Sequence, residues 1–343
     1  MTTHERPGVY SSYEASALIS GSVGGAVVGL VAQSAQGTPG TVTMFYEYES
    51  LAARFSGELA VLAQLLLKNG ASAVAVCPVA TQAGYEGAFQ AMNQTDGIDL
   101  IVCDSTQLSV QQSLKAALEE GAALRRERIA VVPAGGEETV SQMITRAEAL
   151  CSARMVLVAP PTGEDALPDA ALAAAVAGAI AGETDPAVPL GGVVLSGISE
   201  IGQSYSEESL DTLIRGGVTV LEQRAGDVSV IRAVTTRTKT NGASDSTWRE
   251  LTTIRIVDDV IPTIREALKS RFTRRKNTRQ VRSAIRSQVI MELEEKLARE
   301  IITGYGEVSA KALEDKPTVC LVEFSFTVAH GLNQIWLSAK ITV

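Results

Sequence analysis

Residues 97–133 read GIDLIVCDSTQLSVQQSLKAALEEGAALRRERIAVVP, and this stretch decides the fold class. It holds two short, wholly apolar runs, at residues 100–103 and 129–132. Between them, residues 109–121 carry apolar side chains at helical spacing. Apolar strands joined by an amphipathic helix are typical of a parallel sheet that is buried on both faces.

The same alternation extends to both sides of this stretch. Strand-like runs occur at residues 41–46, 73–77 and 155–159, and helical patterns at residues 51–69, 85–92, 139–150 and 169–182. We therefore predict an α/β domain with a mostly parallel sheet in the N-terminal half.

The chain after residue 190 has a different character. We predict a helix at residues 206–216, a hairpin of strands at 218–223 and 228–235, and helices at 248–272 (with Pro262 marking a bend or a new helix start) and 278–302. Strands at 319–328 and 334–343 follow. This second region is predicted to be α+β.

Composition indicates a folded protein of two or three domains, with 343 residues, 45% hydrophobic residues and 20% charged residues. The net charge of -9 argues against nucleic acid as a partner. The four cysteines lack metal or redox spacing and read as small buried hydrophobic residues of a reducing compartment: Cys77, Cys103, Cys151 and Cys320. We find no signal-peptide core and no apolar run fit to span a membrane, so we expect a soluble protein made in a cytoplasm, without membrane contact.

Motifs for chemistry are weak. Residues 21–30, GSVGGAVVGL, lack the dinucleotide-binding spacing, and no P-loop occurs. Gly135-Gly136 fits a strand-to-helix turn better than a phosphate cradle. The histidines, His4 and His330, have no triad setting, and Asp258-Asp259 on a helix fits a cap or salt-bridge role. We predict no catalytic residue, cofactor or metal; an oligomeric nucleotide-binding α/β enzyme is the alternative.

Charge is concentrated between residues 265 and 286, where Glu266 alone opposes nine basic residues. These are Arg265, Lys269, Arg271, Arg274, Arg275, Lys276, Arg279, Arg282 and Arg286. A solvated face and a nucleic-acid patch remain open, although no aromatic residue interleaves after Phe272. We favour docking to an acidic protein. The acidic residues that follow suit end-to-end contacts between identical subunits: Glu292, Glu294, Glu295, Glu300 and Glu307.

Both ends of the chain are strand-competent. The apolar strand expected at residues 334–343 needs a pairing partner, because an unpaired edge of this kind promotes aggregation. Residues 1–20 read as extended and lack an obvious local partner. Strand addition to neighbouring copies would give an open polymer, and pairing within one chain is the alternative.

Four segments resemble the contractile tail sheath family, as found in phages and bacteriocin particles of Gram-positive hosts. They are RPGVY at 6–10, TWRELTTIRIVDD at 247–259, GYGEV at 304–308 and VEFSFTVAHGLNQIW at 322–336. The resemblance is dense from about residue 191 onward and in the N-terminal arm. Across the α/β half it rests on the order of elements.

The resemblance implies four parts. These are an N-terminal linking arm (1–30), an outer α/β domain of subtilisin-like fold without protease function (31–190), an inner C-terminal domain facing a tail tube (191–330) and a C-terminal strand arm (331–343). The implied arm residues are Arg6, Pro7, Gly8, Val9, Tyr10, Ile335, Trp336, Leu337, Ile341 and Val343. The candidate tube contacts are Lys269, Arg271, Arg274, Arg275, Lys276, Arg279, Arg282 and Arg286.

The implied partners are other copies, in six-fold rings stacked into a helical sheath, together with tube, baseplate and tail terminator proteins. Assembly would take place in the host cytoplasm. The resemblance implies a metastable polymer that contracts and drives the tube through a target envelope.

Overall fold

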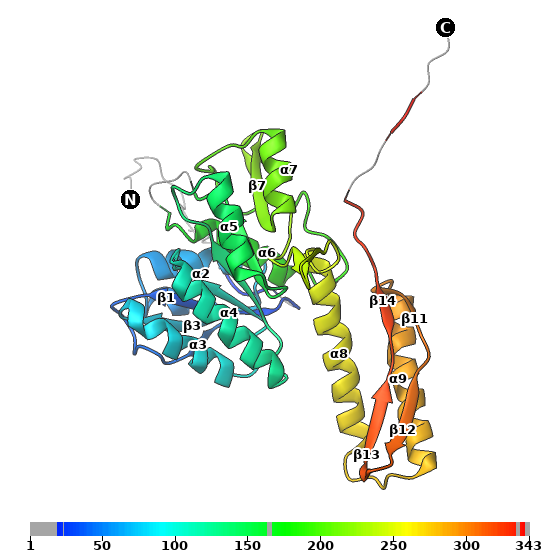
Figure 1. Cartoon of the computed structure of the whole chain (residues 1–343). Helices are drawn as coiled ribbons and strands as arrows, with labels where there is room; N and C mark the ends of the chain where they lie inside the picture. Colours follow the sequence, from blue (N-terminus) through cyan, green and yellow to red (C-terminus); the bar gives the residue numbers. More distant parts are fainter. Residues whose placement is uncertain (1–18, 23, 163–166, 334–336, 340–343) are drawn as a thin grey trace, which may run out of the picture.

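The computed structural model describes residues 19–22, 24–162, 167–333 and 337–339. Figure 1 shows an α/β body and, beside it, an elongated C-terminal unit. The body contains β1 (Val27–Gln33), β2 (Thr43–Phe45), α1 (Tyr48–Ala52), α2 (Glu58–Lys68), β3 (Ala73–Val79), α3 (Tyr85–Gln94), β4 (Leu100–Cys103), α4 (Leu108–Ala123), β5 (Ile129–Pro133), α5 (Val140–Leu150), β6 (Met155–Ala159), α6 (Ala171–Gly182), α7 (Glu207–Arg215), β7 (Val218–Arg224) and β8 (Asp227–Arg232).

One eight-stranded sheet runs through the body in the order β2-β3-β1-β4-β5-β6-β7-β8. The strands from β3 to β7 in this order pair in parallel, while β2 and β8 pair antiparallel at the two edges. The predicted mostly parallel sheet is confirmed.

Helices cover both faces of this sheet. Successive side chains of a strand point to opposite faces, so Val102 packs in the cluster that includes α2 and α6, and Ile101 packs with α3, α4 and α5. The strands are buried along almost their whole length, which explains why they read as continuous apolar runs in the sequence.

The first strand corrects one prediction. β1 lies at the centre of the sheet, with Gly29 aligned to Ala75 of β3 and to Ile101 of β4. The predicted arm boundary at residue 30 therefore falls inside a central strand and is wrong. The glycines just before β1 make this segment resemble a linker in the sequence. Gly25 is required by close packing, because a Cβ there would lie 2.3 Å from the Gly70 carbonyl oxygen.

The β7–β8 hairpin corrects a second prediction. The hairpin itself is confirmed, but β7 pairs in parallel with β6, Val158 aligning with Thr219. The predicted domain boundary at residue 190 therefore cuts one sheet, and the body extends through β8. A local turn signal reveals a hairpin, whereas pairing with a strand far earlier in the chain leaves no local signal.

The C-terminal unit follows a short hairpin, β9 (Lys239–Thr240) and β10 (Ala243–Ser244). It contains α8 (Leu251–Phe272), α9 (Arg279–Ala298), β11 (Ile302–Tyr305), β12 (Ser309–Leu313), β13 (Lys316–Glu323) and β14 (Phe326–Val328). β11 pairs antiparallel with β14 and β12 with β13. Both long helices and the strand region at 319–328 are confirmed, but β11 and β12 were not predicted.

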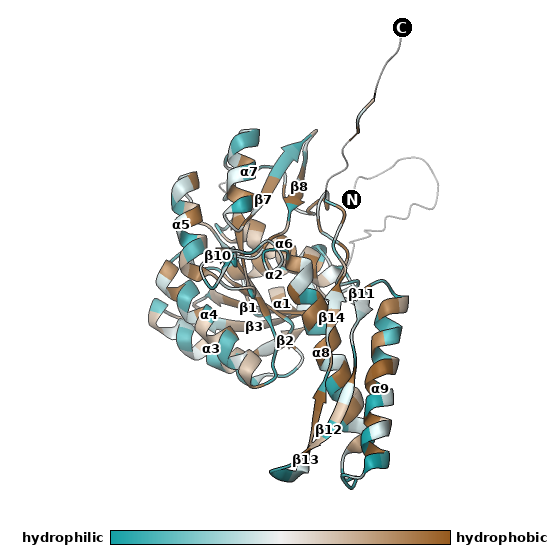
Figure 2. Ribbon diagram, turned by 45° about the vertical axis from the view of Figure 1, so that its right-hand side comes forward, coloured by the Kyte–Doolittle hydropathy of each residue, from teal (hydrophilic) through white to brown (hydrophobic). Residues whose placement is uncertain are grey.

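A small core of its own holds this unit together. Ile256 and Val260 of α8 and Val289 and Leu293 of α9 belong to it, and Phe324, between β13 and β14, packs against it. Figure 2 shows hydrophobic residues along β13 and a hydrophilic far end of the unit. The strand predicted at 334–343 lies mostly outside the described residues; residues 337–339 form no strand, and Leu337 is 93% exposed.

Candidate assembly surfaces

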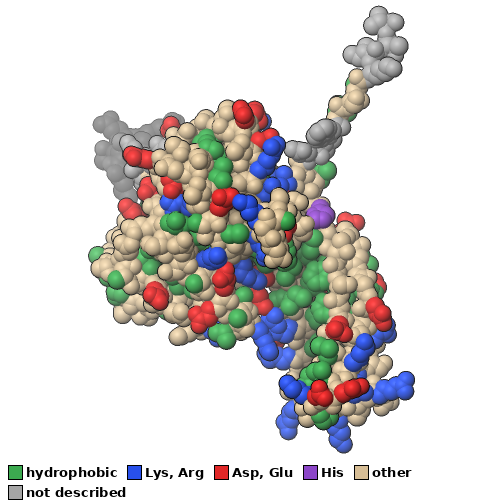
Figure 3. All heavy atoms as spheres, in the orientation of Figure 1, with side chains coloured by type: hydrophobic (Ala, Val, Ile, Leu, Met, Phe, Trp, Pro, Cys, Tyr) green, Lys and Arg blue, Asp and Glu red, His purple; other side chains and the backbone are tan. Residues whose placement is uncertain are grey.

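The eight predicted tube-contact residues lie together at the far end of the C-terminal unit. We call this group, Lys269 to Arg286, the basic tip. It takes in the last turn of α8, the connecting loop and the first turns of α9. Figure 3 shows Lys and Arg side chains gathered at this end.

Four of the eight side chains of the basic tip form hydrogen bonds or ion pairs. Lys269 pairs with Glu266 at 3.3 Å, and Arg271 donates to the Gln288 side chain. Arg282 donates to the Asn277 side chain at 3.0 Å, and Arg286 donates to the Val308 carbonyl at 2.8 Å. The other four residues have no side-chain partner within the described ranges: Arg274, Arg275, Lys276 and Arg279.

The backbone around the tip adds to its positive potential. Thr278 caps α9, its hydroxyl accepting from the Val281 N–H at 3.3 Å. A helix N-terminus carries partial positive charge and favours anions, so basic residues at this end are uncompensated. Asn277 ties the loop to the hairpin, donating to the Pro317 carbonyl at 2.7 Å. The tip is therefore a cationic surface suited to an acidic partner.

Arg265 does not belong to this surface, although the sequence groups it there. Its guanidinium forms two hydrogen bonds with Glu127 of the body, at 2.6 and 3.2 Å. Burial raises the pKa of Glu127, but the hydrogen bonds and charge of Arg265, a backbone hydrogen bond and the charge of Arg154 together lower that pKa below its ordinary value. Arg265 therefore fastens α8 to the body.

A second ion pair joins α8 to the body, and a third joins α8 to α9 within the C-terminal unit. Arg154, beside β6, donates to both oxygens of Asp258 at 2.6 and 2.8 Å, and Lys296 of α9 donates to Asp259 at 2.6 Å. The predicted salt-bridge role of Asp258-Asp259 is confirmed. Burial raises the pKa of Asp258, and Arg154 opposes that effect. The partners Arg154 and Lys296 were missed, because only the fold brings them to α8.

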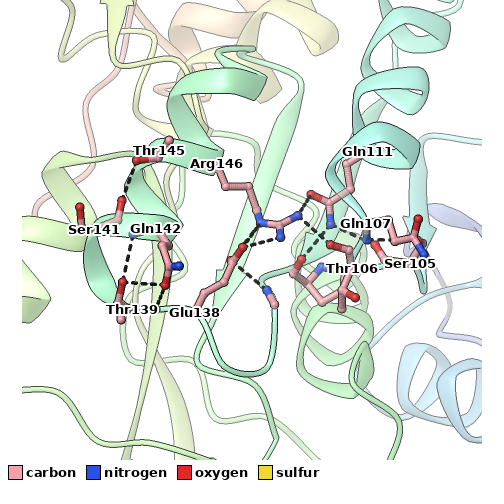
Figure 4. A network of polar contacts seen from close by, with 12 residues as sticks. Ser105, Thr106, Gln107, Gln111, Glu138, Thr139, Ser141, Gln142, Thr145 and Arg146 are labelled. Carbon is pink, nitrogen blue, oxygen red and sulfur yellow. Dashed lines mark hydrogen bonds and ion pairs between the residues drawn. The ribbon is translucent and has the colours of Figure 1, made fainter.

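The carboxyl edge of the sheet is where an α/β enzyme would bind its ligand. There, Figure 4 shows Arg146 of α5 bonded to Glu138 and to Gln111 of α4. Glu138 also accepts from the Gly135 N–H at 3.0 Å, so the glycine turn is occupied by the chain's own carboxylate. Nearby, Tyr85 donates to Asp104. These polar groups therefore form hydrogen bonds with one another at the place where an enzyme would bind its ligand.

Other residues weighed from the sequence have structural settings. Cys77 and Cys103 are buried, while Cys151 and Cys320 are partly exposed. His330 lies in an irregular segment after β14, and His4 lies outside the described residues. In the part of the chain that the structure covers, no group of His, Cys, Asp and Glu is arranged to hold a metal ion. Nor does that part contain a helix long and apolar enough to span a membrane.

The predicted arms fall largely outside the described ranges. Residues 6–10 do, as do Ile335, Trp336, Ile341 and Val343. The chain enters the described structure beside β2, where the Ile19 carbonyl accepts from the Tyr48 N–H at 2.9 Å.

Comparison with known proteins gives the family. Residues 79–236 match the phage tail sheath protein central domain, and residues 243–342 match the phage tail sheath C-terminal domain. A tail sheath protein of Bacillus phage SP01 is 26% identical over 254 residues, which cover 69% of this chain and 42% of that protein. The chain therefore spans less than half the length of this relative.

Solved structures share the fold. The anti-feeding prophage helical sheath in its contracted state has a TM-score of 0.72 at 16% identity, covering 98% of this chain and 99% of that one. The sheath tail protein of Desulfitobacterium hafniense has a TM-score of 0.71 at 11% identity, covering 94% and 100%. With both domain models matched in order from residue 79 to residue 342, the chain belongs to the phage tail sheath protein family.

Proposed function

We propose that this chain is the repeating subunit of a contractile tail sheath. Copies polymerise around a tail tube, and the polymer shortens to drive the tube through a target envelope. The observation that carries the proposal is the match of both sheath domain models, in order. The fold likeness to a contracted sheath over nearly the whole chain supports it.

The arms are proposed to link the copies. In this proposal residues 6–10 and 335–343 add strands to neighbouring subunits. Within the described residues, the β11–β14 and β12–β13 sheets have two strands each, so their outer edges suit strand addition. Backbone ladders of this kind can survive while side-chain contacts exchange.

The basic tip is proposed to face the tube. Its four unpartnered cations, Arg274, Arg275, Lys276 and Arg279, would meet carboxylates of the tube protein. Polar contacts suit an extended, metastable sheath, because they can break and form again with new partners. We further propose six-fold rings, contacts with baseplate and tail terminator proteins, and assembly in the host cytoplasm into a virion or a phage-tail-like particle.

Co-sedimentation with the cognate tube protein tests the proposal. We expect the full chain to pellet with assembled tubes at a fixed ratio. Pelleting of tubes alone at every ratio, with this chain left in the supernatant, would contradict it. A rise in the melting temperature of the chain with a nucleotide would instead favour the enzyme alternative.

A shortened variant tests the arms in the same assay. Deleting residues 1–18 leaves the Ile19–Tyr48 contact in place, so the variant should fold as a monomer with an unchanged melting temperature. We expect it to stay in the supernatant. Normal sheaths from this variant would refute the role of the N-terminal arm.

A further inference from the structure

A second group of arginines lines a cavity on the body, far from the basic tip in sequence. The cavity has a volume of about 530 Å³ and lies between α7, β8 and Arg249, two residues before α8. Arg215, Arg232 and Arg249 line it, and Asn333 joins them from the segment after β14. Figure 3 shows Lys and Arg side chains grouped beside α7, whose position Figure 1 gives.

The apolar part of the lining comes from the body. Leu210 and Ile214 of α7 and Ile231 of β8 line the cavity and also pack against the core on that face of the sheet. The arginines are therefore held on a fixed frame of helix and strand. A site of this kind fits a polar group carried on a short apolar stem.

The three guanidinium groups differ in their partners. Arg232 is paired with Glu250, and Arg215 with Asp211 at 3.2 Å. Arg249 has no side-chain hydrogen bond or ion pair to any residue that the structure describes. The remaining carboxylate in the lining, Glu207, is exposed and forms no ion pair within the described ranges.

Two donors in this lining are buried without an acceptor. They are the Nε atoms of Arg232 and Arg249, and neither has a hydrogen-bond partner in the described structure. Leaving a buried donor unpaired is costly, so native proteins rarely do so without a reason. Burial lowers the pKa of Arg249, with Arg232 and Arg215 adding to that effect and Glu250 opposing it. Among the described residues, the cavity thus holds two buried guanidinium donors, on Arg232 and Arg249, that have no acceptor.

A planar guanidinium binds a carboxylate through paired hydrogen bonds, and the Arg249 side chain donates to no residue that the structure describes. Other copies of this chain can supply such a carboxylate, since each copy has 39 acidic and 30 basic residues. We propose that the cavity receives a side-chain carboxylate from a neighbouring copy. The inference rests on the proposed function, because it requires the chain to polymerise.

Cross-linking inside the assembled sheath tests this directly. The substitution Arg249→Lys places an amine in the cavity, and a water-soluble carbodiimide joins an amine to a carboxylate in contact with it. Sheaths are formed on tubes from a mixture of ¹⁵N-labelled and unlabelled chains, then digested and analysed by mass spectrometry. We expect the lysine introduced at position 249 to join an acidic peptide of another copy, seen as mixed-label pairs.

The native pair Lys239–Glu148, at 2.8 Å and exposed, is the internal control and should cross-link. If it does while position 249 gives no cross-link, or gives one only within a copy, the inference is wrong and the sheath function stands. If the unsubstituted chain forms no polymer with the tube, the proposed function fails and this inference fails with it.

A second variant separates assembly from folding. Arg249→Met removes a guanidinium whose buried Nε has no acceptor among the described residues, so the melting temperature of the monomer should hold or rise. The same change should raise the critical concentration for assembly about tenfold, because the neighbour's carboxylate loses its partner. The control is Arg224→Met, an exposed substitution on β7 outside the cavity, which should leave the critical concentration unchanged. Equal critical concentrations for the two variants would overturn the inference.

Discussion

At the scale of single residues, the buried ion pairs decide how the two parts of the molecule are joined. The Arg154–Asp258 pair is the most enclosed link between the body and α8, with side chains 14% and 17% exposed. A buried pair adds little stability over a well-packed apolar pair, but breaking one leaves a charge without a partner. Residues of this kind fix geometry more than they raise stability.

Arg154→Met should lower the free energy of unfolding by about 3 kcal/mol, because Asp258 stays buried and unpaired. Urea unfolding of the monomer measures this. Glu119→Gln, which breaks an exposed pair with Lys115, should change it by less than about 0.5 kcal/mol. The double variant Arg154→Met with Asp258→Leu should recover most of the loss; equal losses in single and double variants would contradict this account.

Glu138 gives a prediction on pH. Burial alone would raise its pKa, but hydrogen bonds from Arg146 and the Gly135 N–H lower it below the ordinary 4.5. Its stabilising contribution is therefore complete above pH 4.5 and is lost as pH falls through the lowered pKa. Glu138→Gln should be about 2 kcal/mol less stable at neutral pH.

Urea unfolding across the acid range checks the sign. The difference in free energy of unfolding between the unsubstituted chain and Glu138→Gln should shrink as pH falls below 4.5. A difference that stays constant or grows in acid would show that the ion pair is not the cause.

At the scale of elements, helix packing on the sheet depends on close approach of α6 to α2. Gly178 of α6 has no room for a side chain, since a Cβ would lie 2.7 Å from both the Leu66 carbonyl oxygen and the Asn69 Cβ. The backbone of α2 would have to move to accept one. This contact explains why α6 is built almost wholly from small residues.

Gly178→Ala should lower the melting temperature and cost about 2 kcal/mol. Gly87 is the matched control, an exposed glycine inside α3 with no atom near its Cβ position. Gly87→Ala should stabilise the chain by about 0.5 to 1 kcal/mol through helix propensity. If the two substitutions had the same sign, close packing of α2 on α6 would not be the reason for Gly178.

Local patterns were sufficient for most elements. The apolar runs that became β3 to β6 and the periodicity of the helices could be read directly, because both burial and amphipathic spacing are written in short stretches. The hairpin of β7 and β8 followed from its turn. The grouping of Lys269 to Arg286 followed from a helix pair joined by a short loop, which keeps such residues at one end.

Pairing between distant strands could not be read. β1 is flanked by glycines and looks like a linker, although β3 and β4 enclose it. The assignment of β7 to the main sheet depends on β6. The ion pair of Asp258 depends on the approach of α8 to the body, and that of Asp259 on the packing of α9 against α8. The arginine cavity is assembled from α7, β8 and the start of α8, and no spacing in the sequence marks it.

At the scale of the whole molecule, the two ends of the C-terminal unit differ in charge: the far end carries basic side chains that are unpaired among the described residues, whereas the end at the body carries ion pairs. The cationic tip lies at its far end. The ion pairs of Arg154 with Asp258 and of Arg265 with Glu127 hold α8 against the body, and the pair of Lys296 with Asp259 holds α9 against α8. The unit can therefore carry force between the body and whatever the tip contacts.

Reversing charge at the tip tests its proposed contact with the tube. The double variant Arg275→Glu with Arg279→Glu should fold normally, since neither side chain has a partner within the described residues. We expect weaker assembly on tubes and a smaller effect of added salt, because fewer opposite charges meet. Reversal at Arg299, an exposed residue near the base of the unit, is the control. Equal effects at both places would argue against a tube contact at the tip.

The most direct test of the central claim is negative-stain electron microscopy of the purified chain, alone at high concentration and with its tube protein. We expect hollow, striated tubes of uniform width, formed at least in the presence of the tube protein. Discrete small particles under both conditions, beside bare tubes, would contradict the assignment of this chain as a sheath subunit.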